Sequence, residues 1–127
     1  MAFEFLRAEN NASPIEKEIV ATNGTTYAHG AIVAFGSAGT AVTSATNAEF
    51  VYVGKDVTAK TGDTLAVIPV LPEYEFATTF SVNAAARKAG QKVTITGTQA
   101  TATTASGIFQ LLTAGGATGT VAVGRFS

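Results

Sequence analysis

Short stretches of alternating apolar and polar residues, separated by glycine-rich breaks, run along almost the whole chain. The alternating residues are mainly Val, Ile, Thr, Ala and Phe, which favour extended backbone because branched and aromatic side chains pack well on a pleated surface. Alternation places successive side chains on opposite faces of a strand. The pattern therefore predicts an all-β protein of roughly eight to ten short strands.

Several stretches show this strand pattern clearly. They cover residues 15–22, 31–35, 48–53, 65–71, 73–80, 92–98, 108–112 and 120–126. Pro69 and Pro72 indicate that the strand at 65–71 leaves its sheet or lies at an edge, because proline cannot donate a ladder hydrogen bond. At most one short helix is predicted, at residues 83–89, where three alanines follow Asn83.

Glycine marks the predicted turns. Asn23-Gly24 is the strongest short hairpin signal in the chain, because both residues tolerate a positive φ. The glycine-rich stretches Gly36–Gly39 and Gly115–Gly119 are also predicted to be hairpin turns. Neither contains the lysine followed by serine or threonine that a phosphate-binding loop requires.

The first 14 residues differ from the rest of the chain. Phe3 and Phe5 alternate with a charged residue, and the run Asn10-Asn-Ala-Ser-Pro14 then breaks the pattern, because asparagine favours turns. We therefore divide the chain into residues 1–14, an arm or an edge strand, and residues 15–127, one compact β domain. The arm is favoured because the proline separates it from the next strand. Its predicted partner-interface residues are Phe3, Phe5, Leu6 and Arg7.

Few residues of this chain are suited to catalysis. Cysteine is absent, which excludes disulfides and thiolate metal ligands, and the single histidine, His29, is predicted to lie in a surface turn without a partner. The acidic pairs Glu16/Glu18 and Glu73/Glu75 share strand faces but have no matching histidine, so we interpret them as solvated positions. The sequence predicts no catalytic residue, no metal site, no cofactor and no enzymatic activity.

Charge and hydropathy limit the possible partners. The net charge is −1 and the basic residues are scattered, so no stripe for nucleic acid is expected. No run approaches the roughly 20 apolar residues of a membrane span, and the N-terminus does not match a signal peptide. A weakly charged, apolar chain repels its own copies little, which favours self-association or docking on a larger body.

The second half of the chain resembles a known family. The run from Val53 to Phe76 (VGKDVTAKTGDTLAVIPVLPEYEF) and the segments that begin at Gly90, Ala102 and Gly119 are similar to the capsid decoration, or cement, proteins of tailed phages. The resemblance covers roughly the last 75 residues. It implies a β-barrel or tulip-like domain that binds the major capsid protein on the outside of an assembled head, as a homotrimer. It also implies synthesis in the host cytoplasm and a final place on the virion surface.

Two other functions are considered. A β-sandwich module of a phage fibre that binds carbohydrate or a receptor would need Tyr27, Tyr52 or Tyr74 exposed together beside asparagine or aspartate. An enzyme would need a cleft around His29 together with Glu16 or Asp63. Core filling is the expected role of most of the aromatic residues.

Overall fold

The computed structural model describes residues 2–9 and 13–127, so most of the break predicted at residues 10–14 lies outside the described residues. The described parts contain strands and turns and no helix. The strands are β1 (Glu4–Ala8), β2 (Lys17–Val20), β3 (Thr26–Tyr27), β4 (Ile32–Phe35), β5 (Ala41–Thr43), β6 (Phe50–Tyr52), β7 (Val57–Thr58), β8 (Thr64–Pro69), β9 (Tyr74–Thr79), β10 (Lys92–Val93), β11 (Ile95–Thr96), β12 (Gln99–Ala100), β13 (Phe109–Leu111) and β14 (Val121–Phe126).

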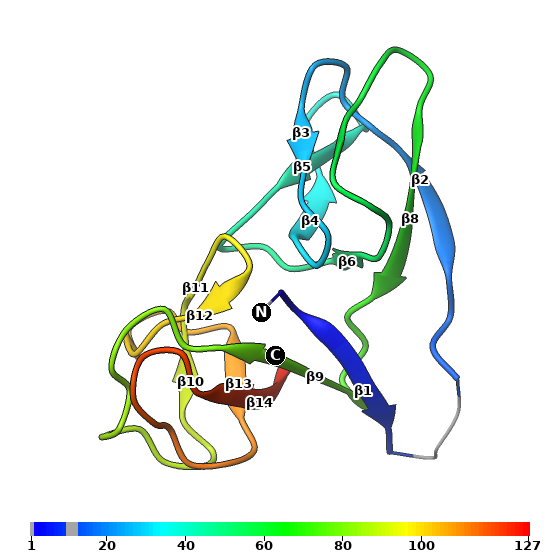
Figure 1. The fold of residues 1–127 in the computed structure, drawn as a ribbon. Helices are drawn as coiled ribbons and strands as arrows, with labels where there is room; N and C mark the ends of the chain where they lie inside the picture. Colours follow the sequence, from blue (N-terminus) through cyan, green and yellow to red (C-terminus); the bar gives the residue numbers. More distant parts are fainter. Residues whose placement is uncertain (1, 10–12) are drawn as a thin grey trace.

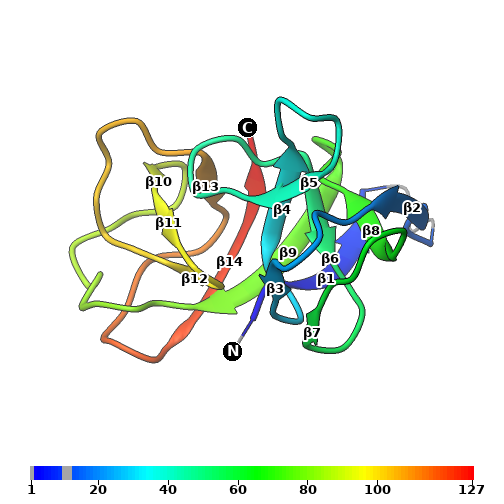
Figure 2. The same cartoon turned by 90° about the horizontal axis from the view of Figure 1, so that it is seen from above.

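Two five-stranded antiparallel sheets form the body of the protein (Figure 1). Sheet A has the strand order β1-β9-β14-β13-β10, and sheet B has the order β2-β8-β6-β4-β5. The ribbon β11-β12 lies with sheet A, and the ribbon β3-β7 lies with sheet B. Seen from above (Figure 2), β4 and β6 of sheet B overlie β9 and β1 of sheet A. The result is an L-shaped molecule with one sheet in each limb.

The larger core is enclosed by sheet A, by the β11-β12 ribbon and by one face of sheet B. Its centre is a group of phenylalanines, in which the Phe3 ring lies 5.3 Å from the rings of both Phe109 and Phe126. Ile32 and Val51 of sheet B are buried in the same cluster. Because one continuous core joins the two sheets, residues from both ends of the chain belong to one packed unit.

A smaller core lies between the other face of sheet B and the ribbon β3-β7. Val33 and Val67 point into it from the sheet, and Tyr27 covers them from the ribbon, all with no exposed surface. The Tyr27 hydroxyl donates to the Ala41 carbonyl at 2.6 Å and accepts from the Thr22 amide at 2.9 Å. The polar end of this buried ring is therefore satisfied by backbone groups.

The all-β prediction is confirmed, but the barrel implied by the resemblance is not present as a closed structure. Each sheet is open within the described residues, with edge strands β1 and β10 in sheet A and β2 and β5 in sheet B. Single parallel bridges join Ala21 to Ala41, across the two edges of sheet B, and Phe80 to Ala100, between sheet A and the β11-β12 ribbon. A closed barrel would need continuous strand pairing at such places.

The predicted arm is wrong, and its alternative, an edge strand, is right. β1 pairs antiparallel with β9, with Glu4 opposite Ala77 and Ala8 opposite Tyr74. Phe3 is only 1% exposed, and burying such a ring contributes about 1.5–3 kcal/mol. The proline break does separate residues 2–9 from β2. The two strands it separates, β1 and β2, belong to different sheets of the same packed protein.

Two local predictions also need correction. Asn23-Gly24 forms a turn, with a Gly24 φ of +83°, but no hairpin, since β2 pairs with β8 and β3 with β7. The Gly24 amide instead donates to the Ala59 carbonyl at 2.8 Å. Residues 83–89 form turns and no helix. Ala84 is buried there and its amide donates to the Gly116 carbonyl at 2.8 Å, so tertiary contacts override the helix propensity of the alanines.

Other predicted elements are closely matched. The Gly36–Gly39 turn closes the β4–β5 hairpin, and the Gly115–Gly119 stretch lies in the loop that joins the paired strands β13 and β14. The strand at 65–71 is present as β8, but it is flanked by β2 and β6, and Pro69 is its last residue. Of the two predicted alternatives, the chain leaves its sheet after Pro69, and the strand does not lie at an edge.

Candidate docking surface

The outer edge of β1 belongs to the segment that carries the predicted partner-interface residues. Sheet A ends at β1, which pairs with β9 alone among the described strands. The register shifts between Phe5 and Arg7, so Leu6 is the extra residue of a β-bulge. The Leu6 side chain is 45% exposed. An open strand edge with an exposed apolar side chain is a site to which another chain can add.

The four predicted interface residues have different environments. Phe3 belongs to the core, and Phe5 is half-buried, with its ring 5.2 Å from that of Tyr74. Leu6 and Arg7 are exposed. The Arg7 Nε donates to Glu75 Oε1 at 3.0 Å, while 64% of the arginine side chain stays accessible. Of the four, Leu6 (45% exposed) and Arg7 present the largest accessible fraction to a partner.

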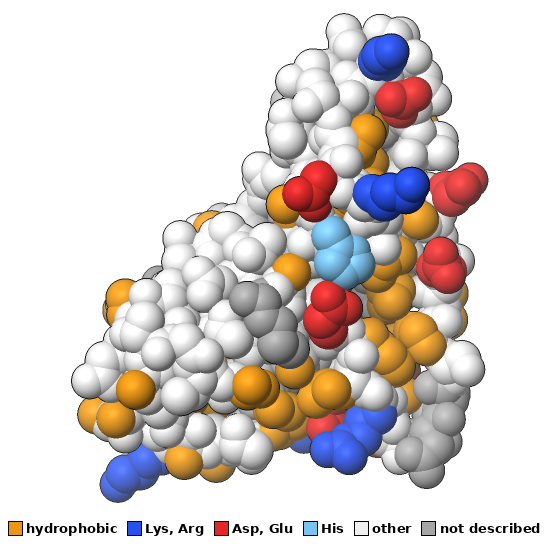
Figure 3. Space-filling view, viewed as in Figure 1, with side chains coloured by type: hydrophobic (Ala, Val, Ile, Leu, Met, Phe, Trp, Pro, Cys, Tyr) orange, Lys and Arg blue, Asp and Glu red, His pale blue; other side chains and the backbone are white. Residues whose placement is uncertain are grey.

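Ile15, which the sequence analysis did not select, joins this surface. Its amide donates to the Tyr74 hydroxyl at 3.0 Å, on the same tyrosine against which Phe5 packs. The Ile15 side chain is 51% exposed. We call Phe5, Leu6, Arg7 and Ile15 the β1 edge surface. Apolar side chains gather on this side of the molecule, between the histidine and the residues left grey in Figure 3.

The outer face of sheet A carries a row of polar side chains. The strand register places Arg7 opposite Glu75, Gln110 opposite Arg125, and Lys92 opposite Gln110. Arg125 Nη1 donates to Glu9 Oε1 at 2.7 Å, and its Nε is buried without a partner among the described residues. These ion pairs bind the end of β1 and the turn after it to the centre of sheet A.

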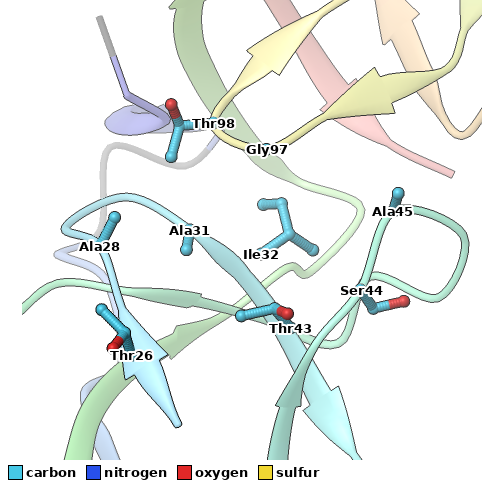
Figure 4. Close-up of a pocket in the computed structure, with 9 residues that line it drawn as sticks. All are labelled: Thr26, Ala28, Ala31, Ile32, Thr43, Ser44, Ala45, Gly97 and Thr98. Carbon is cyan, nitrogen blue, oxygen red and sulfur yellow. The ribbon is translucent and has the colours of Figure 1, made fainter. Parts of the chain in front are cut away.

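Two open grooves lie at the junction of the limbs. One has a volume of about 290 Å³ and runs between the tip of the β11-β12 ribbon, at Gly97 and Thr98, and strands β3 to β5 (Figure 4). Its walls are small apolar side chains and hydroxyls, such as Ala31, Thr43 and Ser44. The second groove, of about 340 Å³, lies beside Phe126 and Pro72. None of the side chains that line the grooves is charged, so their side chains offer shape, hydroxyl groups and, in the second groove, the amide of Asn47.

His29 has partners, contrary to the sequence-based prediction. Its Nδ1 lies 2.9 Å from the Gly54 carbonyl oxygen, and its Nε2 lies 2.9 Å from Glu4 Oε1. The Gly54 hydrogen bond and then the Glu4 carboxylate raise the pKa of the His29 imidazole above its ordinary value of 6.5. Within the described ranges, none of the hydrogen bonds of His29 involves Glu16 or Asp63, the carboxylates that an enzymatic cleft was expected to use.

The three tyrosines are all buried, at 0%, 5% and 3% exposure for Tyr27, Tyr52 and Tyr74. Burial also raises the pKa of the Tyr52 hydroxyl, which donates to the Lys55 carbonyl. Since no tyrosine ring faces solvent, these residues do not form the exposed platform that a sugar-binding module would need. Core filling, the expected role of the aromatics, is confirmed for the tyrosines and for most of the phenylalanines.

Within residues 2–9 and 13–127, no three His, Asp or Glu side chains come close enough together to hold a metal ion. The same part of the chain has no helix of the length and hydrophobicity needed to span a membrane. Comparison with protein-family models and with curated proteins finds no match to this chain.

Proposed function

We propose that the protein is a non-enzymatic structural protein that binds the outer surface of an assembled phage capsid and stabilises it. The proposed partner is the major capsid protein, and the proposed working form is a homo-oligomer, a trimer. It would be made in the host cytoplasm and end on the outside of the virion. The resemblance of residues 53–126 to capsid decoration proteins motivates this function, and the surface of the fold is compatible with it.

The observation that carries the proposal is the β1 edge surface. It combines an open strand edge, two apolar side chains about half exposed and the accessible Arg7. A partner segment can pair with such an edge through backbone hydrogen bonds while Leu6 and Ile15 lose water. Each contact is small, so a trimer that touches several capsid subunits at once would gain affinity through multivalency.

Stabilisation of the shell follows from mass action. A protein that binds the assembled lattice more tightly than free capsid subunits shifts the equilibrium toward the lattice. Such a role requires a stable folded surface and no reactive group. The alternative of a sugar- or receptor-binding fibre module gains no support from this surface, because the tyrosines it would use lie in the core.

The test is co-sedimentation with intact heads and with unassembled capsid protein of the phage that encodes the chain. We expect binding to heads only, and a trimer mass by light scattering. Leu6→Ser should weaken binding to heads several-fold. Val121→Ser is the matched control. Val121 is 53% exposed and pairs with Thr79, beyond the residues of β9 that pair with β1, so this variant should leave binding unchanged. Equal binding to free subunits, or equal losses in the two variants, would contradict the proposal.

A further inference from the structure

His29 lies where the N-terminal strand of sheet A meets a loop of sheet B. The histidine is in the turn between β3 and β4, Glu4 is on β1, and Gly54 follows β6. The next residue, Gly30, has a φ of +78°, and a Cβ on it would come within 2.9 Å of the Phe3 backbone. The chain around Phe3 and Glu4 is thus packed directly against this turn. Figure 3 shows the imidazole on the surface with a carboxylate on either side.

Both ring nitrogens of His29 face oxygen atoms. The Gly54 carbonyl can only accept a hydrogen bond, so Nδ1 must carry a proton to bind it at 2.9 Å. The Glu4 carboxylate, 2.9 Å from Nε2, is also an acceptor when ionised. The imidazolium ion satisfies both partners. The neutral ring keeps the bond to Gly54 and turns a lone pair toward the carboxylate.

The charged groups around the imidazole come from two further elements. Glu4 faces it from β1, and Asp56, in the loop after β6, accepts the His29 backbone amide at 2.8 Å. Lys55 of the same loop is exposed, and its carbonyl accepts the Tyr52 hydroxyl. The Asp56 contact holds the backbone of the turn whatever the state of the ring, so the proton controls only the bond to β1.

We propose that His29 and Glu4 form a proton-operated strap that ties the N-terminal strand of sheet A to sheet B. The strap is closed when the imidazole is protonated and opens when it is neutral. The pairing of β1 with β9 and the buried Phe3 hold the rest of the strand in both states. Opening therefore affects the start of β1, at residues 2–5. This inference is independent of what the β1 edge binds.

The pH range follows from the direction of the pKa change. Folding raises the pKa of His29 above 6.5. While Glu4 is ionised, the strap therefore contributes fully below about pH 6.5 and is lost as the pH rises through the raised pKa of His29. The two side chains are 41% and 48% exposed. At such exposure solvent screens the pair, and a change of roughly two- to fivefold in the opening equilibrium is expected.

The test uses the only histidine of the chain, whose NMR signals need no assignment among several rings. In the wild type we expect a pKa above 6.5 and, at high pH, a neutral ring protonated at Nδ1. Protection of the Phe3–Phe5 amides against hydrogen exchange, corrected for the intrinsic rate, should fall roughly two- to fivefold across the titration. An ordinary or lowered pKa, or a neutral ring protonated at Nε2, would overturn the proposal.

Two matched variants isolate the strap. Glu4→Gln replaces the carboxylate by an amide that can bind either ring state, so the pKa should fall toward its ordinary value and the protection should no longer change with pH. Glu9→Gln makes the same chemical change at a residue that binds Arg125 instead, and it should behave as the wild type does. If the two variants shift the His29 titration equally, the effect is general electrostatics and the strap does not exist.

Discussion

The two sheets are built from different parts of the chain and have different cores. Sheet B uses strands within residues 17–69, and its smaller core is aliphatic, capped by tyrosines whose hydroxyls bind the backbone. Sheet A joins β1 to strands from residue 74 onward, and its core is centred on phenylalanines that pack edge to face or tilted. Sheet B is therefore local in sequence, whereas sheet A cannot be completed without a strand from the other end of the chain. This difference predicts that the two sheets respond differently to damage.

Removing residues 2–9 should have the largest effect, because it deletes an edge strand of sheet A together with a core phenylalanine. Loss of Phe3 alone is comparable to a buried Phe→Ala change, which costs about 3–5 kcal/mol. Denaturant unfolding should show at least that loss, and hydrogen exchange should show amides of sheet A opening before those of sheet B. Leu6→Ser keeps the strand and should change stability by only about 0.5 kcal/mol. If the truncated protein is as stable as the full chain, residues 2–9 do not act as a core strand and the interpretation as an arm is correct.

Tyr27→Phe should have an intermediate effect, confined to sheet B. The ring stays, but the Thr22 amide loses its acceptor, at a cost of about 1–3 kcal/mol. The Ala41 carbonyl keeps the hydrogen bond from the Thr22 hydroxyl at 2.7 Å. Equilibrium unfolding gives the size, and hydrogen exchange should place the loss at β2 and β5. If exchange rises equally in both sheets, the two halves unfold as one unit and the comparison between them fails.

His29→Ala should have the smallest effect, at the junction of the sheets. The half-exposed pair with Glu4 is worth about 0.2–1 kcal/mol, so the variant should be less stable than the wild type by that amount at pH 5.5. The difference should shrink as the pH rises through the raised pKa of His29. Thermal unfolding of both proteins from pH 5.5 to 8.5 measures it. A difference that grows with pH would mean that the neutral ring is the form bound in the folded protein.

The strands were predictable because the residue pattern that favours a strand lies within the strand itself. Residues 31–35 are a compact apolar run and the first residues of 73–80 alternate, and β4 and β9 lie inside those ranges. Pairing was not predictable in the same way. The Asn23-Gly24 turn has the residues of a hairpin, yet its flanking strands find better partners in β7 and β8. A turn signal fixes the local backbone, and the burial of whole strands decides which of them pair.

The candidate surface was predictable only in part, for the same reason. Alternation shows that Phe3 and Phe5 share a face, but it cannot tell whether that face packs on its own domain or on a partner. Glu4 and His29 stand 25 positions apart, and no spacing rule links them, because their contact depends on how the two sheets meet. Ile15 was missed since its position is set by a hydrogen bond from its amide to the hydroxyl of Tyr74, a residue 59 positions away.

The bulge at Leu6 has a consequence for a protein held at high local concentration. Exposed strand edges invite copies of one chain to join edge to edge and grow into fibres. Because the register shifts between Phe5 and Arg7, a second β1 could match its backbone donors and acceptors on only one side of the bulge. The bulged β1 edge thus resists self-pairing along its whole length while leaving room for a differently shaped partner.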